Sequence, residues 1–269
     1  RNNGIPPEAP DAGAWRLTVD GLVDAPMELS IDDLKNRFEV VTEQLVIECG
    51  GNGRGFFDPP ASGNQWTLGA VACSNWTGVR LVDVLKAAGV KDNVVYTAHY
   101  GADAHLSGDP EKLPISRGVP IAKAMNPHNL IAFEQNGAPI HPMNGAPLRL
   151  VVPGWPVAKE DFVIIEAMPV KSLITSPETG GTTDERTIEV RGHAWAGDDV
   201  VAKMEVSIDF GATWMAADLD DPVNPYAWQN WRANVSFPQA GYYEVWARAT
   251  DDKGVGQPHA IAWNPKGYL

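Results

Sequence analysis

The segment "VIECGGNGRGFF", residues 46–57, places one of the two cysteines of the chain beside an unusual loop sequence. An apolar run that is typical of a buried strand leads into Cys49. Four glycines, Asn52 and Arg54 follow within the next six residues. Any interpretation of this chain has to explain why a cysteine stands at the start of a glycine-rich loop, five residues before an arginine.

A phosphate-binding loop is the first candidate for this segment, and the spacing excludes it. The pattern G-x-G-x-x-G is not met, because Phe56 stands where the third glycine is needed. No Gly-Lys-Ser/Thr follows. Pro59 and Pro60 come next instead, so the helix that a nucleotide site requires cannot begin here.

Three roles for Cys49 remain open on the residues alone: a packing residue, a nucleophile or a thiolate ligand of a metal. A nucleophile needs a histidine base, and none of the six histidines stands in a recognisable cysteine-protease context. A single thiolate does not hold a metal strongly, so a cofactor would have to supply the other ligands. Arg54 would then clamp an anion, because its planar guanidinium suits oxyanions.

The composition is typical of a globular protein with one large domain or two of ordinary size. The 269 residues are 44% hydrophobic, and no run approaches the roughly 18 apolar residues of a membrane span. The formal net charge of −13 argues against nucleic acid as a partner. Two cysteines cannot form a disulfide framework, and the sequence has no zinc-ribbon, zincin or covalent c-type haem motif.

The first part of the sequence mixes strand and helix patterns. Ser30 is predicted to cap a helix at its N-terminus and Gly89 to end another, while Cys73 is predicted to pack at the entry to that second helix. The strand patterns cover residues 15–23, 44–49, 93–100 and 146–155, and the helix patterns cover 30–38, 77–90 and 120–126.

The pattern changes after about residue 166. Short alternating runs separated by turn residues, such as "TIEVRGHAWAG" and "GYYEVWARATDD", predict an all-β sandwich. Six of the ten tryptophans lie in this part. Packing in the core and at an interface is the favoured interpretation of these tryptophans, and stacking on a carbohydrate is the alternative.

Several separated segments resemble the sulfite oxidase family of molybdenum enzymes, in the order of that family. They are the cysteine loop 46–57, "QWTLGAVACSNWTGVRLVDVL" at 65–85, the stretch 120–155, and "RGHAWAG", "SIDFGATW", "YAWQNW" and "WNPKGYL" near the C-terminus. The resemblance implies an α+β fold. We expect a sulfite-oxidase-type molybdopterin domain at residues 1–165, followed by an immunoglobulin-like β-sandwich dimerisation domain at residues 166–269, and hence a homodimer.

The resemblance also implies a molybdenum cofactor, with molybdopterin supplying a dithiolene and Cys49 the protein ligand of the metal. The glycines would allow the backbone to approach the bulky cofactor. Arg54 matches an arginine that holds the oxyanion substrate, Arg1 matches a second pocket arginine, and Trp66 matches a pocket tryptophan. These three residues are the predicted catalytic set.

The residues predicted to bind the cofactor, besides Cys49, are Asn2, Asn3, Asp103, His105 and Arg149. Arg149 matches a residue of the family that binds the pterin phosphate. Asp103 and His105 fall where cofactor contacts lie, and a polar network within their own loop is the alternative for both.

The activity implied by the resemblance is oxidation of sulfite, or of a related sulfur oxyanion, to sulfate. The cofactor carries the redox chemistry, and the arginines offset the charge of the substrate. Because the sequence contains no haem motif, we expect the electrons to pass to a separate c-type cytochrome, as in bacterial sulfite dehydrogenases. That arrangement implies a periplasmic location.

Two alternatives stay open. A sulfane dehydrogenase-type subunit of thiosulfate oxidation is similar to this chain, but such subunits tend to lack an arginine at the position of Arg54. A non-enzymatic binding protein with a lost cofactor site is the second alternative. Methionine-sulfoxide reductases share the cofactor domain but lack the β-sandwich that residues 166–269 predict.

The sequence departs from the family at three places. Asn3 stands where relatives often have histidine, and Gln229 stands where animal enzymes have an arginine that reaches the pocket. A pocket tyrosine and further pterin contacts are expected after Trp155 and are not found. We therefore expect segments before Arg1 and after Trp155 to be missing from this sequence.

Overall fold

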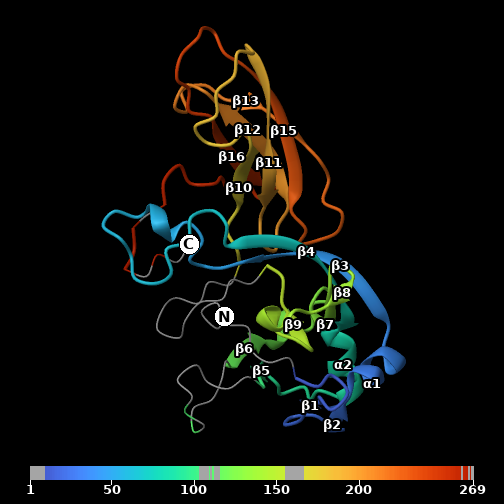
Figure 1. The fold of residues 1–269 in the computed structure, drawn as a ribbon. Coiled ribbons are helices and arrows are strands. Elements are labelled where there is room, and N and C mark those ends of the chain that lie inside the picture. The colour runs from blue at the N-terminus through green and yellow to red at the C-terminus, as the bar shows by residue number, and fades with distance from the viewer. Residues whose placement is uncertain are drawn as a thin grey trace. The chain divides into compact units, whose positions relative to one another are not determined.

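The computed structural model describes residues 10–102, 109, 111, 116–154, 167–261, 263–265 and 267. The chain divides into two compact units, and most of their elements are labelled in Figure 1. Unit 1 comprises Arg1–Glu43 and Asn75–Val152, and unit 2 comprises Gln44–Ser74 and Pro153–Leu269. The segment that contains the cysteine loop therefore groups with the C-terminal strands, and the predicted domain boundary at residue 165 stays a prediction.

Unit 1 is built on small antiparallel sheets. A five-stranded sheet has the order β3-β4-β7-β8, with β9 also paired to β7, and two of its strands continue into unit 2. Two separate hairpins are formed by β1 with β2 and by β5 with β6. The strands are β1 Leu17–Val19, β2 Met27–Leu29, β3 Val40–Glu48, β4 Val71–Arg80, β5 Tyr96–Tyr100, β6 Ser116–Pro120, β7 Leu130–Gln135, β8 Ala138–Pro139 and β9 Arg149–Val151.

Three α-helices are described, and two of them have a cap that the sequence predicts. In α1 (Ile31–Arg37), the Ser30 hydroxyl accepts from the Asp33 amide at 3.0 Å, and the Asp33 carboxylate accepts from the Ser30 amide at 2.9 Å. In α2 (Leu81–Ala88), Gly89 ends the helix with φ 69°. The third helix, α3 (Ile121–Ala124), is a single turn within the predicted range.

The predicted helix over 77–90 is wrong in its first turn. Residues 77–80 continue β4 and pair with β7, where Thr77 lies opposite Glu134 and Val79 opposite Ile131. Pairing with a neighbouring strand satisfies their backbone groups, and β-branched side chains fit that surface. Cys73, which was predicted at a helix entry, lies inside the same strand.

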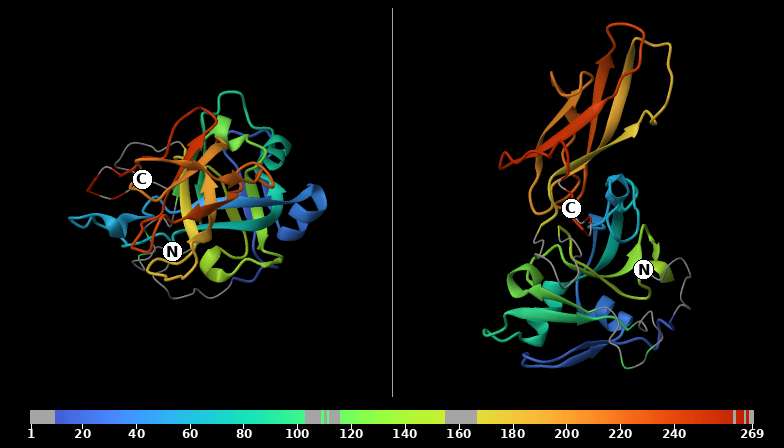
Figure 2. Two further views of the ribbon diagram at one scale, coloured as in Figure 1. Left: turned by 90° about the horizontal axis from the view of Figure 1, so that it is seen from above. Right: turned by 90° about the vertical axis from the view of Figure 1, so that its left-hand side faces the viewer.

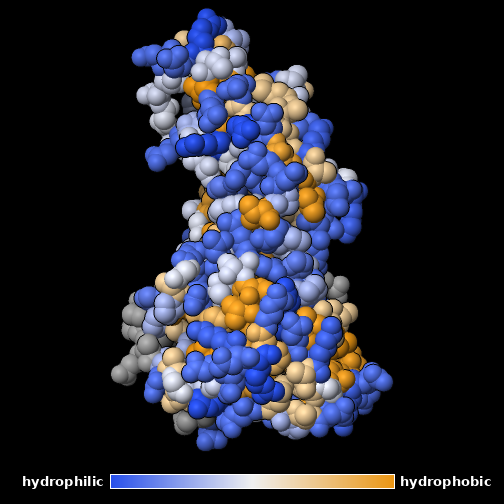
Figure 3. Space-filling model, turned by 90° about the vertical axis from the view of Figure 1, so that its right-hand side faces the viewer, coloured by the Kyte–Doolittle hydropathy of each residue, from blue (hydrophilic) through white to orange (hydrophobic). Residues whose placement is uncertain are grey.

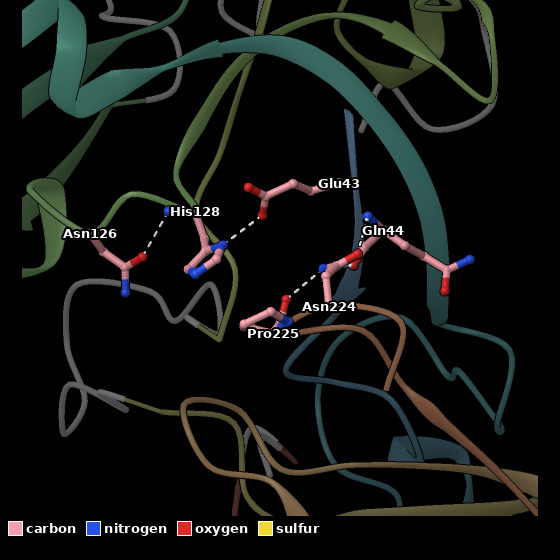
Figure 4. A network of polar contacts seen from close by, with 6 residues as sticks. All are labelled: Glu43, Gln44, Asn126, His128, Asn224 and Pro225. Atoms are coloured by element: carbon pink, nitrogen blue, oxygen red, sulfur yellow. Dashed lines mark hydrogen bonds and ion pairs between the residues drawn. The ribbon is translucent and has the colours of Figure 1, made fainter. Parts of the chain in front are cut away.

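The core of unit 1 is formed by apolar residues from its three helices and its sheets. Its fully buried members include Leu29, Leu34 and Val79. A polar contact lies beside it, where His128 Nδ1 is 2.7 Å from Glu43 Oε2 and the His128 amide donates to Asn126 Oδ1 at 2.9 Å (Figure 4). These contacts tie the turn before β7 to β3.

Unit 2 contains the predicted β-sandwich, seen from further sides in Figure 2. One sheet has the order β10-β11-β15-β14, and the other has the order β13-β12-β16. The α+β fold with a C-terminal β-sandwich is therefore confirmed. The strands are β10 Lys171–Ser176, β11 Thr187–Trp195, β12 Val201–Ser207, β13 Met215–Ala216, β14 Asp218–Leu219, β15 Gln229–Ser236 and β16 Trp246–Asp251.

The sandwich core follows from strict alternation along β15, in which every second residue is buried. Trp231 points inward and is fully buried with Met204 and Val206 from the facing sheet. A second, smaller cluster joins Trp195 to Val46. Packing is thus confirmed as the role of Trp231 and Trp195, while Trp263 is largely exposed.

Unit 2 also holds the part of β3 that leads to the cysteine loop. The backbone N–H of Gln44 donates to Asn224 Oδ1 at 3.0 Å, and Asn224 Nδ2 donates to the backbone carbonyl of Gln44 at 2.9 Å (Figure 4). These two hydrogen bonds anchor β3 to the loop before β15.

The face of the protein drawn in Figure 3 is mainly hydrophilic, and its hydrophobic residues form separate patches. No helix in the described part of the chain has the length and apolarity needed to cross a membrane.

Candidate active site

The cysteine loop begins where β3 ends, and backbone hydrogen bonds fix its course. The Cys49 amide donates to the Ala70 carbonyl at 2.9 Å, and the Cys49 carbonyl accepts from the Asn52 amide at 2.8 Å. Further along, Gly53 donates to Thr67 at 2.6 Å and Gly55 donates to Trp66 at 2.8 Å. The loop is therefore attached along one side to residues 66–70, while Cys49 itself is exposed.

Arg54 lies within this loop at the start of a short 3-10 turn, η1 (Arg54–Phe56). It is only 4% exposed, and its Nη1 donates to the Asn64 carbonyl at 2.9 Å. A Cβ atom at Gly51 would lie 2.5 Å from Arg54 Cζ, and one at Gly63 would lie 2.6 Å from Nη1. The guanidinium occupies the space that a side chain at either position would take, so a larger residue there would have to displace Arg54.

Two polar residues of the loop were missed by the sequence analysis. The Glu48 carboxylate, in the last residue of β3, accepts from Lys171 Nζ at 2.7 Å and from Trp195 Nε1 at 3.1 Å. Asn52 donates to the same carboxylate at 3.1 Å and accepts from the Ala70 amide at 3.0 Å. The signal was present, because a glutamate in an otherwise apolar strand must find partners if it is buried.

Trp66, the predicted pocket tryptophan, lies beside the cysteine loop. Its backbone carbonyl accepts from Gly55, and its side chain is 43% exposed. Cys49, Arg54 and Trp66 thus lie on one continuous loop system of unit 2. Their roles toward metal and substrate stay predictions.

Arg149, the predicted phosphate contact, lies in β9 of unit 1. Its Nη1 donates to the Asn144 carbonyl at 2.9 Å, and its guanidinium carbon lies 5.1 Å from the centre of the Trp76 ring. Trp76 Nε1 is buried and has no hydrogen-bond partner among the described residues. The role of Arg149 toward a pterin phosphate stays a prediction.

The other predicted site residues lie outside the described residues: Arg1, Asn2, Asn3, Asp103 and His105. Gln229, which stands where animal relatives have an arginine, is described and has a packing role. Its amide is buried, accepting from the Val201 amide at 3.0 Å and donating to the Val201 carbonyl at 3.1 Å. These bonds join β15 to β12.

The donor atoms of the chain fit a metal whose other ligands come mostly from a cofactor. Among the described residues, no group of three or more His, Cys, Asp and Glu side chains could hold a metal ion. The exposed thiol of Cys49 is a soft donor that can complete the ligand set of a molybdenum carried by molybdopterin. The fit is therefore good, and Cys49 would hold the metal.

Comparison with protein families divides the chain into two parts. Residues 3–161 match the oxidoreductase molybdopterin binding domain, and residues 162–269 match the Mo-co oxidoreductase dimerisation domain. The chain belongs to the sulfite oxidase family of molybdenum enzymes. The prediction of a molybdenum cofactor bound through molybdopterin is thereby confirmed.

Curated members of the sulfite oxidase family cover nearly the whole chain. Mitochondrial sulfite oxidase of Homo sapiens is 30% identical over an alignment of 321 positions that includes 99% of this chain. The chain spans 58% of the length of that relative. Nitrate reductase [NADH] 1 of Oryza sativa subsp. japonica is 28% identical, with 100% of this chain and 36% of the rice protein covered.

The fold also matches a solved structure of the family. The sulfane dehydrogenase SoxCD from Paracoccus pantotrophus superimposes with a TM-score of 0.77 at 28% sequence identity. The match covers 92% of this chain and 70% of that chain. Both sulfur chemistries that the sequence suggested are therefore represented among the relatives.

Proposed function

We propose that this sulfite oxidase family member oxidises sulfite to sulfate and passes the electrons to a separate c-type cytochrome. The observation that carries the proposal is Arg54, a fixed cation built into the loop that bears Cys49. The 30% identity with human sulfite oxidase supports the same substrate. The overall change converts sulfite and water into sulfate, two protons and two electrons.

The predicted metal ligand and the three predicted catalytic residues each have a defined part in this proposal. When bound, molybdopterin supplies a metal centre capable of two-electron chemistry, and Cys49 holds that metal through its thiolate. Arg54 and Arg1 offset the negative charge of sulfite, and Trp66 lines the pocket from the segment attached to the loop. The buried position of Arg54 keeps its charge at one place, so it attracts the anion without reorganising.

The electron acceptor, the location and the assembly belong to the same proposal. A one-electron carrier must take the electrons one at a time, which a c-type cytochrome does. Such a carrier fits the periplasm, where we place the protein. The match of residues 162–269 to a dimerisation domain supports a homodimer.

A second candidate function has a specific observation in its favour. The likeness to the sulfane dehydrogenase SoxCD, with a TM-score of 0.77, supports oxidation of a sulfane sulfur instead. Arg54 favours sulfite, because the sulfane enzymes tend to lack an arginine at this position. The two candidates differ in the substrate that would bind beside Cys49, which is sulfite in one and a sulfane sulfur in the other.

The test is reduction of cytochrome c by the molybdenum-loaded protein. Sulfite, thiosulfate and a protein-bound persulfide are offered in parallel as electron donors. We expect reduction with sulfite that is at least about 100-fold faster than with the persulfide, because the persulfide lacks the oxyanion that a charge-assisted contact of about 3 kcal/mol would bind. Faster reduction with the persulfide would replace sulfite by a sulfane substrate. A protein that takes up no molybdenum and reduces no cytochrome c with any of the three donors would support the binding-protein alternative.

A further inference from the structure

The residue immediately before the predicted metal ligand carries a buried charge. The side chain of Glu48 is 3% exposed, and that of its ion-pair partner Lys171 is 15% exposed. A buried carboxylate is costly unless it is paired and hydrogen-bonded. Both carboxylate oxygens of Glu48 accept hydrogen bonds. Oε1 accepts from Lys171 and Asn52, and Oε2 accepts from Trp195.

We propose that Glu48 is a positioning residue for Cys49, held by Lys171 and Trp195 of the β-sandwich. The proposal rests on the proposed function, because it takes Cys49 to be the metal ligand. Glu48 and Cys49 share a peptide bond, so fixing the side chain of one restricts where the other can place its thiolate. The carboxylate therefore acts on the metal site through the backbone.

A ring of hydrogen bonds closes around the base of the loop. Asn52 Nδ2 donates to Glu48 at 3.1 Å, and Asn52 Oδ1 accepts from the Ala70 amide at 3.0 Å. The Ala70 carbonyl accepts from the Cys49 amide at 2.9 Å. The ring returns to Glu48 through the chain, so a disturbance of the carboxylate is passed to the backbone of Cys49.

The sandwich supplies the two groups that anchor this ring. Lys171 is the first residue of β10 and Trp195 the last of β11, and the two residues are directly opposite each other in the sheet. They lie in the part of the chain that matches a dimerisation domain, residues 162–269. One end of the sandwich therefore orders the loop that bears Cys49, which is a role separate from dimerisation.

The direct test is hydrogen exchange, followed by mass spectrometry, on the protein purified with its cofactor. The variants Lys171→Met and Glu48→Gln each remove one charge of the pair and keep a similar volume. We expect the amides of residues 49–55 to exchange at least about tenfold faster, while those of β12 and β16 keep their rates. Lys171→Arg restores a cation at the same place and should restore slow exchange in the loop.

The matched control is a carboxylate of the other sheet. Glu205 accepts from Arg248 at 2.9 Å and pairs with Lys203 at 2.7 Å, and its side chain is 10% exposed. Glu205→Gln should leave the exchange of residues 49–55 unchanged. An equal rise of exchange in the loop and in the whole sandwich for Lys171→Met would overturn the proposal, because it would show a loss of general stability.

A second readout reports on the metal ligand itself. A coordinated thiolate contributes to the visible absorption of a metal centre, so a displaced Cys49 should shift the absorption of the loaded protein in Lys171→Met and return it in Lys171→Arg. If Lys171→Met does not fold, Trp195→Phe removes the N–H donor to Glu48, together with the five-membered part of the indole, and leaves the ion pair of Glu48 with Lys171 in place. An unchanged spectrum and unchanged loop exchange in Trp195→Phe and Glu48→Gln would then overturn the proposal.

These measurements separate the inference from the proposed function. A protein that shows the expected loop exchange but does not oxidise sulfite supports the positioning role and contradicts the substrate. A protein that oxidises sulfite with unchanged exchange in all the variants keeps the proposed function and loses the positioning role of Glu48.

Discussion

Cys49 and Cys73 are the two cysteines of the chain, and their surroundings are opposite. Cys49 is exposed at the end of a strand, on a loop fixed by backbone hydrogen bonds and a buried ion pair. Cys73 lies inside β4 and packs against the apolar cluster of Val46, Met168 and Trp195. Burial raises the pKa of the Cys73 thiol to about 11.

The difference shows that backbone position decides what a cysteine can do. A residue inside a strand points its side chain to one face of a sheet, where packing favours the neutral thiol. A residue just after a strand is free of that packing, and a glycine-rich loop keeps other side chains away from it. A metal ligand must be reachable as a thiolate, and of the two cysteines Cys49 has the exposed position.

The largest expected effect comes from removing each thiol in turn. Cys49→Ala should lose its molybdenum or keep a centre that does not turn over. Loss of a residue that only hydrogen-bonds to a metal ligand lowers activity roughly 10–100-fold, and loss of the ligand itself should lower sulfite oxidation by more than that. Cys73→Ala should keep its molybdenum content and its activity within about twofold. Metal analysis and steady-state kinetics on both variants give the comparison, which fails if Cys49→Ala still oxidises sulfite at the full rate.

The next effect is on thiol reactivity. In the Cys49→Ala variant at pH 8, Cys73 should react with a thiol reagent about 100-fold more slowly than an ordinary thiol, because its pKa rises from 9.0 to about 11. The rate should climb about tenfold per pH unit until the pH approaches 11. Because folding favours the protonated thiol, its contribution to stability is complete below pH 9 and is lost as the pH rises toward 11. The unfolded protein is the control, and equal rates in both states would contradict the account.

Arg54→Gln should lower kcat/KM for sulfite by about tenfold to more than a hundredfold, since a charge-assisted contact is worth about 1.5–3 kcal/mol. The molybdenum content should not change, because Arg54 is not a ligand. Arg54→Lys should recover only part of the loss, since an ammonium lacks the planar fork. A variant with normal kinetics and a lowered melting temperature would show that Arg54 only shapes the loop.

The smallest expected effect tests the close packing of the loop. Gly51→Ala places a Cβ against the Arg54 guanidinium and should lower the free energy of unfolding by about 1–3 kcal/mol. Gly69→Ala is the control, because nothing lies within 4 Å of the position of its added Cβ. Denaturant unfolding of both variants measures the difference. Equal stability of the two variants would contradict the enclosed position of Arg54.

Local features of the fold could be predicted from the sequence. Ser30 and Asp33 form their capping contacts within one turn, so their residue types and spacing are enough. The alternation of apolar and polar residues along β15 likewise predicts which side chains point into the core. The start of α2 was misplaced because Thr77–Arg80 have no local strand signal stronger than the helix pattern, and only pairing with β7 shows their state.

The site was predictable where function imposes a residue type and spacing. Cys49 and Arg54 stand out in the sequence because a glycine loop with a cysteine and an arginine is unusual. The contacts of Glu48 could not be predicted from the sequence, because its partner Lys171 lies 123 positions further along the chain. A buried charge tells that a partner exists but not which residue provides it.

The ligand role of Cys49 is tested most directly by X-ray absorption at the molybdenum edge of the loaded protein. Cys49→Ala, if it retains any metal, should have one sulfur ligand fewer than the wild type, while Cys73→Ala should have the same number. Loss of all molybdenum only from Cys49→Ala would agree with the same assignment. An unchanged number of sulfur ligands in metal-loaded Cys49→Ala would contradict it, because the thiolate of Cys49 would then not bind the metal.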